Sequence, residues 1–190
     1  MKIINTDLKW NGSLSVRQTT TYIVLHHRAG DGTVESIHKQ HQDQGWAGIG
    51  YHYYIRKDGT IYTGRPLATV GAHTTNYNEH SIGVCFEGDY SKEDTMPSAQ
   101  FKAGNKLLRH LSHTYPHAVF VEHNQLQATA CPGEHFPFQL ITRFAEDLTV
   151  AEAIDVVKEA CGFSDKTMEY FKCYKYDKDL VIKLAKAILK

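Results

Sequence analysis

The sequence predicts an α/β fold in which helices flank a mixed central β-sheet, with a small all-helical appendix at the C-terminal end. Short runs of β-branched and aromatic residues alternate with amphipathic segments over most of the 190-residue chain, which is the pattern of strands connected through helices. Two of the predicted strands flank a hairpin turn, so the sheet is expected to be mixed rather than all parallel. From about Thr149 onward, only helical periodicity remains.

The strands are predicted from their composition and from the turns that bound them. The tripeptide Lys57-Asp58-Gly59 is a strong hairpin signal between two aromatic segments. The other segments are apolar runs of the kind found in buried strands. The predicted strands are Thr21–His27, Tyr51–Ile55, Thr60–Tyr62, Ser81–Phe86 and Ala118–Val121.

Helix start and stop signals separate these strands. Thr33 can cap a helix whose first turn contains Glu35, and Gly45 is expected to end it. Pro97 suits the first turn of the longest helix, which places Leu108 and Leu111 on one face. The predicted helices in this part of the chain span residues 34–44, 97–115 and 138–148.

The residues after Thr149 form the predicted appendix. Val150, Ile154 and Val157 are spaced for a helix that ends at Gly162, and two further helices are expected over residues 164–171 and from 177 onward. Such a short segment cannot hold a large core alone, so we expect it to dock on the main domain or on another subunit. We therefore divide the chain into residues 1–148 and 149–190.

Composition limits the classes of function. Lys+Arg and Asp+Glu both number 21, so the chain lacks the basic surplus expected of a nucleic-acid or polybasic membrane binder. Asp7 and Lys9 interrupt any apolar signal-peptide core, and no run is long enough for a membrane span. We expect synthesis in the cytoplasm, where cysteines are free or metal-bound rather than paired.

Two histidines and one cysteine are candidate metal ligands. His26 closes an apolar run, and His123 lies eight positions before Cys131. Together they make a suitable zinc set with one coordination position open, which distinguishes a catalytic zinc from a structural one. The spacing itself is not that of a zinc finger, and a lone histidine at a strand end is more often a satisfied core residue. The prediction therefore depends on whether the three side chains meet in space.

Four motifs occur in order along residues 20–148: the strand ending in His26, segment 50–59, segment 70–84, and His123-x7-Cys131-Pro132. Together they resemble the zinc N-acetylmuramoyl-L-alanine amidases of the phage lysozyme and peptidoglycan-recognition-protein type. The resemblance implies the mixed-sheet fold of that family and one zinc ion per chain, held by His26, His123 and Cys131. Among the members, the chain looks most like a phage or prophage endolysin.

The resemblance also implies roles for other side chains. Tyr51 matches a tyrosine that faces the zinc and assists the reaction, with an ordinary strand tyrosine as the alternative. Thr129 stands where several phage members have Lys and recognition-protein amidases often have Thr; its hydroxyl can donate a neutral hydrogen bond but supplies no positive charge. His73 matches a histidine of the substrate groove, with a purely structural role as the alternative. Asn78 is a further candidate for substrate binding, although it better suits a role in holding its own loop.

The implied reaction is hydrolysis of the amide between N-acetylmuramic acid and the L-alanine of the stem peptide, which lyses the bacterial cell wall. Without a signal peptide, the enzyme would need another factor to reach that wall. A cytosolic amidase that recycles muropeptides fits the same observation. A non-catalytic peptidoglycan-recognition module is a third possibility, but such modules typically lack the cysteine that is Cys131 here. The appendix could bind the wall, form homo-oligomers or cover the edge of the main domain.

Overall fold

The computed structural model describes residues 2–143, 149–172 and 177–188. The chain divides into two compact units, Met1–Phe138 and Gln139–Lys190. The sequence places the domain boundary ten residues later than this, at 148/149, and part of that region, residues 144–148, lies outside the described residues. The assignment of a main domain and a helical domain with that boundary stays a proposal.

The first unit is built on a six-stranded sheet with the strand order β1-β4-β3-β5-β2-β6. Strands β3 and β4 are antiparallel, whereas the other neighbouring strands run parallel. The predicted mixed sheet is therefore confirmed. The strands are β1 (Ile3–Ile4), β2 (Tyr22–His27), β3 (Tyr53–Ile55), β4 (Ile61–Thr63), β5 (Ser81–Phe86) and β6 (Val119–Glu122).

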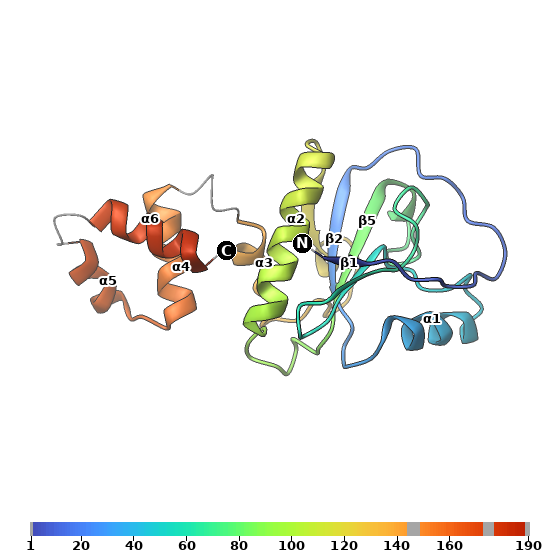
Figure 1. Cartoon of the computed structure of the whole chain (residues 1–190), viewed down its shortest axis with the longest axis horizontal. Coiled ribbons are helices and arrows are strands. Elements are labelled where there is room, and N and C mark those ends of the chain that lie inside the picture. Colours follow the sequence, from blue (N-terminus) through green and yellow to red (C-terminus); the bar gives the residue numbers. More distant parts are fainter. Residues whose placement is uncertain (1, 144–148, 173–176, 189–190) are drawn as a thin grey trace. The chain divides into compact units, whose positions relative to one another are not determined.

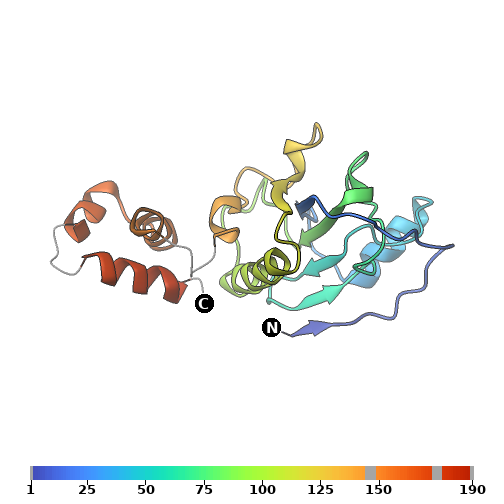
Figure 2. The same ribbon diagram turned by 90° about the horizontal axis from the view of Figure 1, so that it is seen from above.

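Helices cover both faces of this sheet. Figures 1 and 2 show α1 (Val34–Asp43) and α2 (Ser98–Thr114) on opposite sides of the strands. Thr33 caps α1 as predicted, with its side chain accepting from the backbone N–H of Ser36. On the α1 side, Val34 and Ile37 pack with Cys85 of β5 in one buried cluster. Two short 3₁₀ helices, η1 (Asn78–His80) and η2 (His123–Gln125), precede β5 and follow β6.

Some predicted boundaries are wrong. Within the described residues, the helix predicted over residues 138–148 is found only as α3 (Phe138–Ile141), after which the backbone N–H of Arg143 donates to Leu140 and closes a tight turn. The part of this prediction that covers residues 144–148 lies outside the described residues. Strand β3 begins at Tyr53 rather than Tyr51, since the chain bends at residue 52. Strand β1 was not predicted, because two residues are too few to show a periodic pattern.

The second unit contains α4 (Val150–Cys161), α5 (Asp165–Lys172) and α6 (Asp177–Ile188), which confirms the predicted helical appendix. Thr149 caps α4 in a capping box with Glu152. Gly162 ends α4 with a left-handed φ of 62°, a conformation that favours glycine. The helices bury a small apolar set: Ala153, Val156, Val157, Met168, Val181 and Ala185.

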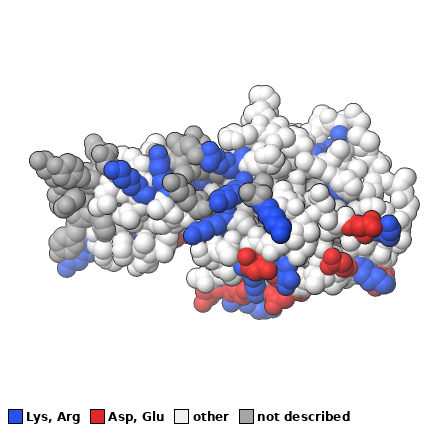
Figure 3. Space-filling model, in the orientation of Figure 1, with Lys and Arg blue, Asp and Glu red and all other residues white. Residues whose placement is uncertain are grey.

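Charged side chains are partly segregated on the surface. On the face seen in Figure 3, acidic side chains gather along the lower edge of the first unit, next to basic ones. Several such groups are paired, as in Arg56–Glu87 at 3.3 Å and Lys57–Glu93 at 2.9 Å. Among the described helices, none combines the length and the apolar character that crossing a membrane requires.

Candidate active site

The register of the sheet brings His26 and His123 together. Strand β6 runs parallel to β2 with Glu122 beside Leu25. The residue that follows Glu122 is His123, so it comes level with His26 at the carboxyl end of the sheet. The centroids of the two imidazole rings lie 4.5 Å apart. Ligand sites gather at this end of parallel strands, because the strands stop there and loops begin.

Cys131 reaches the same point through a tight turn. The backbone N–H of Asn124 donates to the Cys131 carbonyl at 2.9 Å. Gly133 adopts a φ of 97°, and a Cβ atom there would lie 2.3 Å from the backbone of Tyr90. Only glycine allows this approach. As a result, the Cys131 Sγ atom lies 3.4 Å from the backbone N–H donor of His27, at the end of β2.

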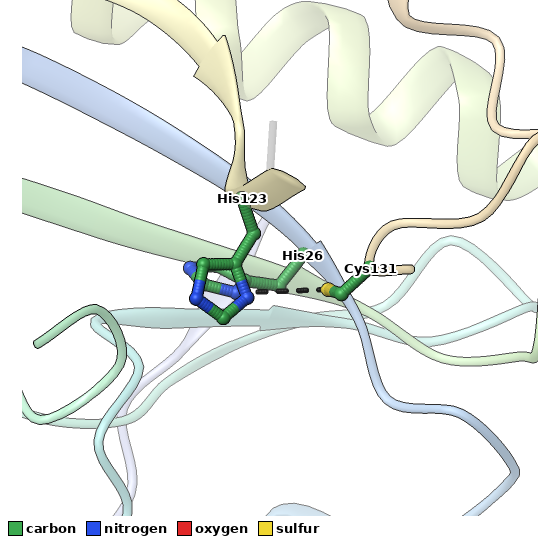
Figure 4. Close-up of side chains that lie close together, drawn as sticks. All are labelled: His26, His123 and Cys131. Carbon is green, nitrogen blue, oxygen red and sulfur yellow. Dashed lines mark hydrogen bonds between the residues drawn. The ribbon is translucent and has the colours of Figure 1, made fainter. Parts of the chain in front are cut away.

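The three candidate ligands therefore meet. One nitrogen or sulfur atom from each of His26, His123 and Cys131 lies within 4.8 Å of the others, the one such group found among the described residues. Figure 4 shows the side chains converging from β2, from the segment after β6 and from the following loop. His26 Nδ1 lies 3.8 Å from Cys131 Sγ, close to the roughly 3.5 Å separation of two ligand atoms on one tetrahedral zinc. Two imidazoles and one thiol fit zinc and leave a position for water or substrate.

Hydrogen bonds fix which nitrogen of His26 faces this centre. His26 Nε2 lies 3.0 Å from His73 Nδ1, and His73 Nε2 lies 3.3 Å from Ser81 Oγ. The Ser81 hydroxyl donates to the Tyr77 carbonyl at 2.7 Å, so its oxygen accepts the proton of His73 Nε2. His73 Nδ1 is then an acceptor for His26 Nε2–H. This assignment leaves the lone pair of His26 Nδ1 free on the side of Cys131.

The second histidine is oriented in the same way. His123 Nε2 lies 2.8 Å from the side-chain oxygen Oε1 of Gln127. An amide oxygen only accepts, so Nε2 carries the proton and Nδ1 is left for a metal. Partners of this kind hold metal-binding histidines in one tautomer and one orientation. The sequence offered no signal for Gln127, because glutamine four positions after a histidine is common in any loop.

Burial sets the protonation states of these groups. It lowers the pKa of His26 well below its ordinary value, with the nearby His123 and His27 as further causes, so the ring is neutral and can offer a lone pair. Burial also raises the pKa of Cys131 to about 12, so this thiol holds its proton at neutral pH until a cation replaces it. A neutral His26 imidazole beside a partly buried thiol is suited to a metal cation.

Tyr51 borders the metal-ligand cluster. Its ring centroid lies 5.1 Å from that of His26, and the residue packs against the buried cluster that contains Cys85. Burial raises the pKa of Tyr51 well above its ordinary value, so the phenol keeps its proton and can donate. A row of rings continues from Tyr51 to His41 at 5.7 Å and from His41 to Trp46 at 4.6 Å. Trp46 is 41% exposed, so this row runs from the ligand cluster to the surface.

The other candidate residues make mostly local contacts. Thr129 is exposed, and its hydroxyl oxygen accepts the backbone N–H of Cys131 at 3.2 Å, which leaves the hydroxyl proton free to donate. Asn78 Oδ1 accepts the backbone N–H groups of His73 and Thr74 at 2.8 and 2.9 Å, so it holds that loop. The Thr74 hydroxyl also lies 2.9 Å from His73 Nδ1. The lone pair of this nitrogen can therefore accept from both the Thr74 hydroxyl and His26 Nε2–H.

His73 itself is packed inside the first unit. It is 8% exposed, and it fits because Gly83 of β5 lies beside it: a Cβ on Gly83 would come within 2.6 Å of the ring. The structure thus places His73 against a candidate metal ligand. Direct contact of His73 and Asn78 with substrate stays a prediction.

The fold and the site together define a class. A mixed α/β sheet that carries two histidines and a cysteine around one point, with a partly buried tyrosine beside them, is an arrangement that suits a hydrolase with a single metal ion. The family model described as N-acetylmuramoyl-L-alanine amidase matches residues 16–134. The chain belongs to this family, as the resemblance in its motifs predicts.

Individual relatives agree with this family. The endolysin of Enterobacteria phage K11 is 38% identical over 125 residues, which cover 62% of this chain and 83% of that protein. Peptidoglycan-recognition protein SC2 of Drosophila melanogaster is 34% identical over 143 residues, covering 66% of this chain and 77% of its own length. Among solved structures, the N-acetylmuramoyl-L-alanine amidase LysC from Clostridium intestinale is 37% identical with a TM-score of 0.72 and covers 74% of this chain and 95% of its own. The predicted fold and family are therefore confirmed.

Proposed function

We propose that the chain is an endolysin that hydrolyses the amide between N-acetylmuramic acid and L-alanine in bacterial peptidoglycan, and that the reaction depends on zinc. The observation that carries the proposal is the meeting of His26, His123 and Cys131 within 4.8 Å, in a chain of the amidase family. The endolysin and amidase names of its relatives support this activity over that of a recognition module.

The metal would be held through Nδ1 of His26, Nδ1 of His123 and Sγ of Cys131. Zinc in such a site supplies a Lewis acid that polarises the scissile carbonyl and makes water a nucleophile near neutral pH. The chain's own part is to hold both imidazoles in one orientation, through His73 and Gln127. We assign His73 to this positioning role.

Tyr51 and Thr129 are the proposed donors to the reacting amide. The protonated phenol of Tyr51 lies beside His26, where it can donate to the oxygen that gains charge. The Thr129 hydroxyl lies in the turn that carries Cys131 and can add a second, neutral hydrogen bond. Neither residue brings a positive charge, so charge stabilisation would come mainly from the metal.

The test uses purified, insoluble peptidoglycan. The protein should release new amino termini that are all L-alanine, and a chelator should abolish the release until zinc is restored. Release that continues unchanged in the chelator would remove zinc from the mechanism. Release of reducing sugars, or of amino termini other than L-alanine, would remove the amidase assignment.

The same assay separates the rival functions. An endolysin should act faster on polymeric wall than on soluble anhydro-muropeptides, whereas a recycling amidase should show the reverse order. Tight binding of muropeptides without any turnover would favour the recognition module. The cell wall is accordingly the proposed place of action.

The helical unit keeps several possible roles. Wall binding and formation of homo-oligomers both remain predictions. Gel filtration of the full chain and of residues 1–148, together with sedimentation on insoluble wall, would assign one of them. Loss of sedimentation on truncation would support wall binding, and a change of oligomeric state would support association through these helices.

A further inference from the structure

Arg28 carries a positive charge next to the ligand cluster without a partner for that charge. Its Nη2 donates to the side-chain oxygen of Gln40, and its backbone N–H donates to Phe86 at 2.8 Å. No carboxylate of the described residues forms an ion pair with it. Its Nε is the one buried side-chain nitrogen or oxygen in the described part of the chain that has no hydrogen-bond partner. Such a donor calls for an explanation, because leaving it unsatisfied costs about 1–3 kcal/mol.

The position of Arg28 connects it to the candidate active site. Its backbone bond to Phe86 continues the pairing of β2 with β5, so its side chain leaves the sheet on the same face as that of His26. Its partner Gln40 is the neighbour of His41 on α1. The ring of His41 in turn lies 5.7 Å from that of Tyr51. Arg28 therefore lies on the α1 side of Tyr51.

The surroundings do not neutralise this charge. Burial, followed by the charge of Arg28, lowers the pKa of His41 to about 4, so that imidazole is neutral at physiological pH. The nearby groups thus leave a net positive potential at the edge of the cluster. The guanidinium edge formed by Nε and an Nη atom is the part that binds carboxylates through two parallel hydrogen bonds.

We propose that Arg28 forms a subsite for a carboxylate of the stem peptide, on the α1 side of Tyr51. This inference rests on the proposed function and specifies its substrate. The second residue of the stem peptide is a glutamate linked through its side chain, which leaves one carboxylate free unless the wall is amidated there. The subsite therefore selects stem peptides with a free carboxylate over those in which it is an amide.

The binding test uses two product peptides that differ in this one group and cannot be cleaved. L-alanyl-D-isoglutamate and L-alanyl-D-isoglutamine, each with its side-chain carboxyl blocked as a methylamide in place of the next residue of the stem peptide, are titrated by calorimetry into the full-length protein. The free acid should bind about tenfold more tightly, as expected for one charge-assisted hydrogen-bonding pair. In Arg28→Gln the affinity for the acid should fall to that for the amide, while the amide binds as before. Arg28→Lys should retain part of the preference, because lysine keeps the positive charge but lacks the two parallel N–H donors of the guanidinium.

A matched control removes a charge from the same side of the sheet. Lys39 lies on α1, is exposed and pairs with Asp43, so Lys39→Gln should keep the full preference for the acid. Equal affinity of the unaltered protein for the two peptides, no binding of either, or a preference that survives in Arg28→Gln would each overturn the proposal. Because neither peptide is a substrate, an Arg28-dependent preference would stand even if the amidase assay failed.

Discussion

The Nε2 atom of His26 lies 3.0 Å from the Nδ1 atom of His73, and this bond determines which nitrogen of His26 is presented to Cys131. The two histidines belong to separate motifs of the sequence, one at the end of β2 and one in the loop before η1. Their contact links segment 70–84 to the candidate metal centre. A residue expected to touch substrate is therefore placed to act through a candidate metal ligand.

Replacing His73 should weaken zinc binding more than it weakens the fold. In His73→Ala the His26 ring loses the acceptor that fixes its tautomer, and we expect zinc affinity to fall about 10–100-fold. His73→Asn should recover part of this loss, because its side-chain oxygen can accept from His26 Nε2. Competition with a chromophoric chelator measures the affinity. A folded His73→Ala protein with unchanged zinc affinity would contradict the positioning role; His110→Ala, on the exposed face of α2, serves as control.

Cys131 should be essential for the metal. Cys131→Ser replaces a sulfur ligand by a hydroxyl that does not ionise near neutral pH, so zinc content should fall from about one per chain to a small fraction of that. Metal analysis after dialysis measures this content, and the wall assay should lose activity in parallel. Cys161→Ser is the matched control, because Cys161 is an exposed free cysteine at the end of α4. Equal zinc content in both variants would contradict the ligand role of Cys131.

Much of the fold was predictable from local signals. The start of α1 and the extent of β5 are each determined by residues that are neighbours in the sequence: the capping threonine of α1 and the apolar run Ser81–Phe86. The predicted bounds of both elements therefore agree closely with the structure. The two-residue β1 and the early end of α3 were not predictable, because both depend on tertiary contacts rather than on periodicity. The same limit applies to any element that is shorter than one period of its pattern.

For the candidate site, the sequence could indicate which residues are suitable metal ligands, but not that their side chains meet in space. The approach of His26 to His123 follows from the pairing of β2 with β6, and strand pairing between distant segments leaves no trace in spacing. The motifs identified the three candidate ligands through their resemblance to a family. The unsatisfied Nε of Arg28 and the bond between His123 and Gln127 could be found only from coordinates.

Tyr51 should affect the rate and leave the metal in place. Tyr51→Phe removes the phenol donor beside His26 but keeps the ring that packs on the core, so zinc content and thermal stability should change little. The rate on peptidoglycan should fall about 100–1,000-fold, the cost of losing one donor to a developing oxyanion. Tyr62→Phe in β4 is the control, since Tyr62 also packs against this cluster. If both variants retained full activity, Tyr51 would have no part in the mechanism.

Acid should destabilise the protein through His52, whose ring is 1% exposed. Its Nδ1 accepts the Gly83 N–H at 3.0 Å and its Nε2 donates to the Thr69 carbonyl at 2.9 Å, so the fold holds the neutral ring. Burial lowers its pKa to about 3, with the Thr69 hydrogen bond opposing and the charges of Arg17 and Arg65 adding to this effect. Between that value and the ordinary pKa of roughly 6.5, the unfolded chain binds a proton that the folded chain does not. The stabilisation is complete above the ordinary pKa and is lost as the pH falls below it.

The expected loss from His52 alone between pH 7 and pH 5 is about 2 kcal/mol in the free energy of unfolding. Urea unfolding of the zinc-free protein at pH 5, 6 and 7 measures this dependence. The pKa values of the buried His73 and the partly buried His41 are lowered as well, so the total loss should exceed this figure. His52→Gln keeps a donor and an acceptor but does not titrate, and its curve should therefore be flatter than that of the unaltered protein by about 2 kcal/mol over this range. Parallel curves for the two proteins would show that His52 is protonated in the folded state, against the burial and hydrogen bonding described above.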